Sequence, residues 1–129
     1  MRPGFAAALL VAGLAVPPLA AEGGSLSADV GGIRVELVSE PARPGTRQPT
    51  IYRVRLAQGD GRPVSGMRLT LRGRMADGMT VLAPLAPAQE PGIYAGRVLF
   101  TMEGPWDLTL RIAGKDHTFE LPLTEHVGR

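Results

Sequence analysis

The sequence predicts an all-β fold in which six or seven short antiparallel strands pack as two sheets. Three observations support this prediction. Apolar residues recur at every second position in successive runs between residues 33 and 123, glycine and proline separate the runs, and no run has the spacing of an amphipathic helix. A strand with one buried and one solvated face needs this alternation, because successive side chains point to opposite faces of a sheet.

Six runs show the alternation, and each defines an expected strand. The residues expected to face the interior are, run by run, Ile33, Val35 and Leu37; Tyr52, Val54 and Leu56; Met67, Leu69 and Leu71; Tyr94, Val98, Phe100 and Met102; Trp106, Leu108, Leu110 and Ile112; and His117, Phe119, Leu121 and Leu123. Polar residues, many of them arginine, occupy the alternate positions. Trp106 follows a Gly-Pro step and is expected to anchor the core.

Residues that favour chain reversal stand between the runs. They are Pro44-Gly45, Gly59-Asp60-Gly61, Asp77-Gly78, Pro91-Gly92, Gly104-Pro105 and Gly114-Lys115-Asp116. Residues 79–90 are less regular. Because Pro84 and Pro87 cannot donate hydrogen bonds to a central ladder, we expect a crossover or a broken edge strand in this segment.

The N-terminus has the organisation of a secretory leader. Arg2 precedes the apolar run FAAALLVAGLAV, a Pro-Pro step follows, and the small residues Ala20 and Ala21 provide a cleavage point. We therefore interpret residues 1–21 as a signal peptide and expect export to a bacterial periplasm. An uncleaved membrane anchor is the alternative, although a membrane span needs about 20 strongly apolar residues.

The rest of the chain divides into three parts. Residues 22–31 begin with a Gly/Ser-rich stretch and are expected to form a flexible connector. Residues 32–124 form the β-sandwich domain. Residues 125–129 are expected to be a disordered tail, because chain ends are the usual place for disorder.

Composition excludes several classes of protein. The 129 residues contain no cysteine, which rules out disulfide frameworks, thiolate zinc sites and cysteine nucleophiles. The formal charge is only +2, and no basic tract interleaved with aromatic residues suggests a nucleic-acid partner. Neither a nucleophile with a base, nor paired carboxylates, nor a phosphate-binding glycine loop is present, so we expect no enzyme and no small-molecule substrate.

Several motifs occur in a telling order between Met75 and Ile112. Gly78-Met79 is followed by Pro84, then by Pro-Gly-Ile-Tyr at 91–94, then by Phe-Thr-Met at 100–102, and finally by Gly-Pro-Trp at 104–106. This order resembles the YtkA-like and FixH-like periplasmic domains, which are small immunoglobulin-like modules of bacteria. The resemblance implies an immunoglobulin-like antiparallel β-sandwich of about seven strands after the signal segment.

The resemblance also implies an accessory role. Some relatives are linked with copper, because FixH-like proteins accompany copper-transporting pumps during assembly of a respiratory oxidase. They also carry an N-terminal membrane anchor. Many relatives place histidine before the Gly-Met step, whereas this chain has Met75-Ala76-Asp77-Gly78-Met79. A copper-handling or membrane protein complex is therefore the expected partner.

Reduced copper accepts thioether sulfur, so methionine is the first residue type to consider as a ligand in a chain without thiols. Met75 and Met79 flank the reversal at Asp77-Gly78 and could place two sulfurs on one loop. Met102 or His117 would have to complete a Cu(I) site. The alternative is packing. Met75 and Met79 could simply pack at the edge of the sheet, and Met67 and Met102 fall in phase with inward faces, where methionine fills irregular gaps. His126 lies in the expected tail and is a weaker candidate.

Arginines dominate the outward positions of the predicted strands. They are Arg34, Arg53, Arg55, Arg68, Arg72 and Arg111. If the sheets bring some of them together, that face could dock an acidic protein or an anionic lipid surface. The alternative is a solvated sheet exterior that discourages edge pairing. Docking on an envelope or membrane complex through an arginine-rich face is thus the second functional hypothesis.

Overall fold

The computed structural model describes residues 25–129, and the expected signal peptide at 1–21 lies outside this range. Eight strands make up the fold. They are β2 (Ser25–Val30), β3 (Ile33–Glu40), β4 (Thr50–Gln58), β5 (Arg68–Arg74), β6 (Thr80–Pro87), β7 (Ile93–Val98), β8 (Gly104–Ala113) and β9 (Thr118–Val127). Within this range no helix has the length and apolar character to cross a membrane.

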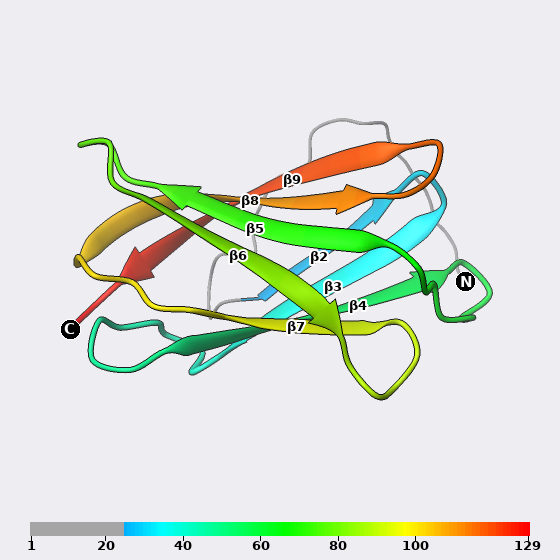
Figure 1. Ribbon diagram of the computed structural model, residues 1–129, viewed down its shortest axis with the longest axis horizontal. Coiled ribbons are helices and arrows are strands. Elements are labelled where there is room, and N and C mark those ends of the chain that lie inside the picture. The colour runs from blue at the N-terminus through cyan, green and yellow to red at the C-terminus, as the bar shows by residue number, and fades with distance from the viewer. Residues whose placement is uncertain (1–24) are drawn as a thin grey trace.

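The strands form two facing halves joined by one strand. Their hydrogen-bonded order is β2-β3-β4-β7-β6-β5-β8-β9, and every neighbouring pair is antiparallel. Strand β6 pairs with β5 from Thr80 to Leu85, and its last two residues, Ala86 and Pro87, pair with β7. Figure 1 shows β6 running diagonally from one half to the other. The irregular segment at 79–90 is therefore a strand that crosses between the halves.

Close backbone contact at this crossing explains Gly96 on β7. A Cβ atom at Gly96 would lie 2.5 Å from the carbonyl oxygen of Pro84 and 2.5 Å from Cδ2 of Leu85. No side chain larger than hydrogen fits there without a backbone shift. The gap that Gly96 leaves in the apolar pattern thus marks the place where β6 crosses β7.

The two halves enclose a single apolar core. Trp106, Tyr52, Tyr94 and Phe100 are its largest fully buried side chains, and aliphatic residues from all eight strands surround or adjoin them. The inward residues expected for β3, β4, β5 and β8 are buried, apart from the first residue of β3 and the methionine that precedes β5. The predicted all-β fold of packed antiparallel layers is confirmed.

Both ends of the domain extend further than the sequence indicates. Residues 22–31, expected to be a flexible connector, contain β2, in which Leu26 is buried. The apolar alternation in this strand is limited to Leu26 and Ala28, which is too short to predict a strand. Strand β2 is stabilised by pairing with β3 along its whole length. Residues 125–129, expected to be a disordered tail, contain the end of β9, where Glu125 and Val127 are buried opposite the start of β8.

Two residues expected to face the core lie at the surface. Met102 is 42% exposed, because β7 ends at Val98 and only Phe100 of the following loop turns inward. His117 is also exposed, since it belongs to the turn that precedes β9. The period-two pattern of the sequence continues past the ends of the strands in both places.

Candidate functional site

A tight hairpin turn between β5 and β6 brings Met75 and Met79 opposite each other. The backbone N–H of Met75 donates to the carbonyl of Met79 at 2.8 Å, and the N–H of Gly78 donates to the carbonyl of Met75 at 3.0 Å. Gly78 has φ of 100°, a conformation that favours glycine. The Oδ1 atom of Asp77 accepts the N–H of Met79 at 3.0 Å and so stabilises the turn.

Met102 lies in the β7–β8 loop at the same end of the sandwich (Figure 1). The side chain of Met75 contacts the β7–β8 loop. Its Cε atom lies 3.0 Å from the position that a Cβ atom would occupy if Gly104 carried one. The indole N–H of Trp106 donates to the carbonyl of Met102 at 3.0 Å and fixes the loop. We call this region, defined by Met75, Met79 and Met102, the methionine end.

The three methionines differ in accessibility. Met75 is half-buried and packs against the core, whereas Met79 is 38% exposed and Met102 is 42% exposed. Large apolar side chains with this much exposure are surface features. The packing role expected for Met102 is therefore wrong, because its side chain lies outside the core.

His117 lies at the opposite end of the molecule. It belongs to the turn between β8 and β9, where its carbonyl accepts the N–H of Gly114 at 2.8 Å. Strand β8 separates this turn from the methionine end, and its ten residues span about 30 Å. His117 and the methionine end therefore cannot share a metal ion. Met67 lies near His117, with its sulfur 3.0 Å from the position of a Cβ on Gly114.

His126 is nearer to the methionine end than the sequence suggests. It is ordered in β9, directly opposite Pro105 of β8, and it is exposed. Its neighbours Glu125 and Val127 are buried, so His126 is on the outer face of this half. Over residues 25–129 no three side chains among histidine, cysteine and the acidic residues cluster closely enough to hold a metal. Thioether sulfur is the ligand chemistry that the methionine end offers.

A buried polar pair in the core was not predicted from the sequence. The hydroxyl of Tyr52 on β4 donates to the carboxyl of Glu125 on β9 at 2.9 Å, across the two halves. Tyr52 is 0% and Glu125 is 2% exposed. The hydroxyl of Thr50, also buried, has no hydrogen-bond partner among residues 25–129. Glu125 is in phase with Leu121 and Leu123, and this phase is the sequence signal that could have placed it inside.

Burial shifts both titrating groups of this pair. Desolvation raises the pKa of Glu125 above its ordinary value and outweighs the Tyr52 hydrogen bond and the charge of the neighbouring His126, which act in the opposite direction. Desolvation, reinforced by Glu125, raises the pKa of Tyr52 as well. Tyr52 therefore remains a protonated donor, and folding favours the neutral form of Glu125.

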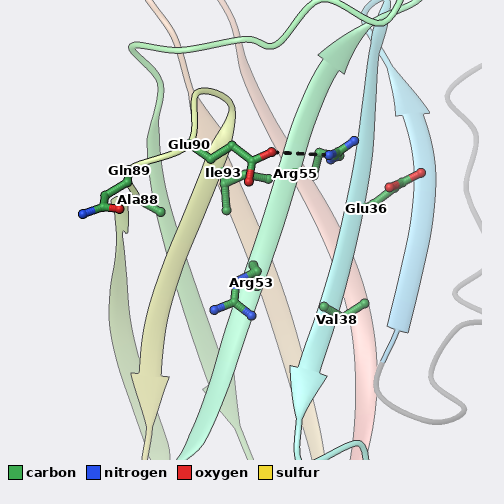
Figure 2. Close-up of a pocket in the computed structure, with 8 residues that line it drawn as sticks. All are labelled: Glu36, Val38, Arg53, Arg55, Ala88, Gln89, Glu90 and Ile93. Atoms are coloured by element: carbon green, nitrogen blue, oxygen red, sulfur yellow. Dashed lines mark ion pairs between the residues drawn. The ribbon is translucent and has the colours of Figure 1, made fainter.

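The arginines occupy two outer faces that point away from each other. Arg53 and Arg55 project from β4, where they line a shallow groove with Val38 and Ile93 (Figure 2). Arg55 pairs with Glu90 at 3.8 Å. Arg68 lies on β5, in the other half of the sandwich. Arg53 and Arg55 therefore do not share a surface with Arg68, although the sequence left open that these arginines lie together.

Fold and surface together define a class: an immunoglobulin-like β-sandwich domain with exposed methionines at one end. A family model described as YtkA-like matches residues 27–111, and the chain belongs to this YtkA-like family. The expected resemblance is confirmed. No curated protein matches the chain.

Solved structures support the same fold. A DUF4426 family protein from Pseudomonas aeruginosa PAO1 is similar, with a TM-score of 0.64 at 10% identity, over 81% of this chain and 95% of that one. The Lin-41 filamin domain is similar with a TM-score of 0.52 at 25% identity, over 67% of this chain and 83% of that one. These similarities concern the fold.

Proposed function

We propose that this protein is an exported, non-catalytic accessory domain that holds Cu(I) weakly through its methionine end. The observation that carries the proposal is the position of Met75, Met79 and Met102 at one end of the sandwich, on two segments that contact each other beside Gly104. Methionine clusters of this kind suit a soft, reduced metal ion, because thioether sulfur prefers Cu(I) to harder cations.

The local chemistry fits such a ligand set. Met79 and Met102 are exposed, so an ion could reach their sulfurs from solvent without opening the core. One oxygen of the Asp77 carboxylate is bonded within the turn, and a carboxylate is a harder donor than the thioethers that Cu(I) prefers. A site made of two or three thioethers carries no charge and stays open to solvent. These properties favour weak binding and release to a partner.

Titration with Cu(I) against a competing chelator tests this function. We expect saturable binding tighter than micromolar. Changing Met79 and Met102 to leucine should weaken the affinity by about tenfold or more, because loss of a residue that only supports a metal ligand already lowers affinity by about tenfold. Leucine keeps the apolar volume and removes the sulfur. Met67→Leu and His117→Ala, at the opposite end, serve as matched controls and should leave binding unchanged. An unchanged affinity for Cu(I) in the Met79→Leu/Met102→Leu protein would rule the proposal out.

A second candidate function is docking on an envelope complex through the groove beside β4. The observation that favours it is Arg53, an exposed arginine between Val38 and Ala95 in adjacent strands of the same face. None of the ion pairs in the described part of the chain includes Arg53. An acidic segment of a partner protein could supply the missing carboxylate while its apolar side chains cover Val38.

Charge reversal distinguishes the groove from other surfaces. We expect the Arg53→Glu/Arg55→Glu variant to lose an envelope protein that the wild-type chain retains in pull-down experiments. Arg68→Glu, on the opposite outer face, should retain the same protein. Equal retention by both variants would exclude the groove as the docking site.

A further inference from the structure

The outer face formed by β5 and β8 carries an excess of positive charge. Arg68, Arg72 and Arg74 project from β5 on this face, and Arg111 projects from β8 opposite Thr70. All four side chains are exposed. Residues 68, 72 and 74 share one phase of β5, and Arg111 lies on β8 at the level between the first two. The four arginines therefore form a line of positive charge along these two adjacent strands.

Two carboxylates on this face stand against the four arginines, so acidic residues neutralise only part of its charge. Asp107 and Glu120 are the carboxylates on the outer positions of β5, β8 and β9. Glu120 pairs with Arg111 at 3.7 Å, and Asp107, directly opposite Arg74 in the sheet, accepts the hydroxyl of Thr124 at 3.5 Å. Arg68 and Arg72 take part in none of the ion pairs found between residues 25 and 129.

A single large apolar side chain stands beside these arginines. Leu82 of β6 is 68% exposed, the highest value among the exposed large apolar residues of the described chain, and it pairs directly with Arg72 in the sheet. The remaining outward residues of β6 in this half are Thr80 and Pro84. The face thus combines a cationic line with one leucine at its margin.

We propose that this face docks on an anionic membrane surface. Guanidinium groups bind phosphate oxygens in bidentate geometry, and a leucine beside them can enter the acyl boundary of the bilayer. A stable protein interface needs an apolar core of several side chains, whereas this face offers one. The charge and the isolated Leu82 therefore match a lipid surface better than an acidic protein.

This docking does not depend on metal binding. It uses the outer face of β5, β6 and β8, whereas the proposed Cu(I) ligands lie on the turns at one end. The two features are nevertheless adjacent, because Arg74 immediately precedes Met75 in the chain. A protein docked in this way would hold its methionine end close to the membrane surface.

Vesicle sedimentation tests the proposal. The purified protein is mixed with vesicles of phosphatidylglycerol and phosphatidylcholine in equal parts, and with vesicles of phosphatidylcholine alone. We expect binding to the anionic vesicles that decreases with salt. The Arg68→Glu/Arg72→Glu variant should bind at least about twentyfold more weakly, since each arginine near an anionic surface contributes roughly fivefold. Leu82→Ser should weaken binding further.

The matched control is Arg53→Glu/Arg55→Glu, which reverses the same number of charges on the opposite outer face. It should retain most of the binding. Arg68→Gln/Arg72→Gln removes charge without reversing it and repeats the test if the glutamate variant unfolds. Equal losses in the variants of both faces, or equal binding to neutral vesicles, would overturn the proposal. So would retention on immobilised polyglutamate through Arg68 and Arg72 with no vesicle binding, because the face would then serve an acidic protein.

Discussion

Replacement of Trp106 by alanine is expected to lower the free energy of unfolding by about 3–5 kcal/mol. Trp106 is fully buried and packs against Phe100, with ring centroids 5.3 Å apart. It is the largest side chain between the two halves, so its removal leaves a cavity that neither half can close alone. Urea denaturation followed by circular dichroism measures the loss, since the variant has no tryptophan fluorescence.

Trp106→Phe is the control for this prediction. It keeps much of the apolar volume of the tryptophan, loses part of the indole ring system, and removes the N–H that donates to the Met102 carbonyl. We expect a smaller loss of stability than for alanine, together with faster amide exchange in the β7–β8 loop. A loss below about 1 kcal/mol for Trp106→Ala, the level typical of surface changes, would mean that this residue does not hold the halves together.

Removal of the Tyr52 hydroxyl is expected to destabilise the protein by about 1–3 kcal/mol, because it leaves the buried Glu125 carboxyl without its donor. The cost of Tyr52→Phe should increase with pH. The hydroxyl stabilises the ionised carboxylate more than the neutral acid, and more of Glu125 is ionised as pH rises. Urea denaturation of both proteins at several pH values between acid and neutral measures the difference.

Glu125→Gln tests the sign of this pH dependence. Burial raises the pKa of Glu125 in the folded chain above its value in the unfolded chain. The favourable contribution of the neutral acid is therefore complete below the unfolded pKa and is lost as pH rises through the folded pKa. Glutamine cannot titrate, so the stability of the wild type relative to Glu125→Gln should fall with increasing pH. A constant difference across this range would mean that folding does not raise the pKa of Glu125.

The fold could be predicted from the sequence to a large extent, because the buried residues of a two-layer β protein occupy every second position along each strand. The runs around Val54, Leu71 and Leu110 each show it over several residues. Prediction failed where an element buries few side chains and depends largely on pairing with its neighbour. Strand β2 has only Leu26 as a deeply buried residue, and the end of β9 is fixed by its register with β8.

The candidate site could be predicted only in part. A turn at Asp77-Gly78 depends only on residues close together in the chain, so the sequence was enough to predict that Met75 and Met79 lie on either side of it. The end at which a distant residue lies depends on strand order and direction, which no local pattern contains. Met102 and His117 were both candidates for this reason, and the structure separates them by the length of β8. The distribution of arginines over two outer faces depends on the same topology.

X-ray absorption at the copper edge of the Cu(I)-loaded protein tests the central claim most directly. If Met75, Met79 and Met102 hold the ion, sulfur scatterers should dominate the first coordination shell, and their contribution should fall in the Met79→Leu/Met102→Leu variant. The His117→Ala variant should give an unchanged spectrum. An imidazole nitrogen shell in the wild type that disappears in His117→Ala would contradict the account, because it would place the copper at the opposite end of the sandwich.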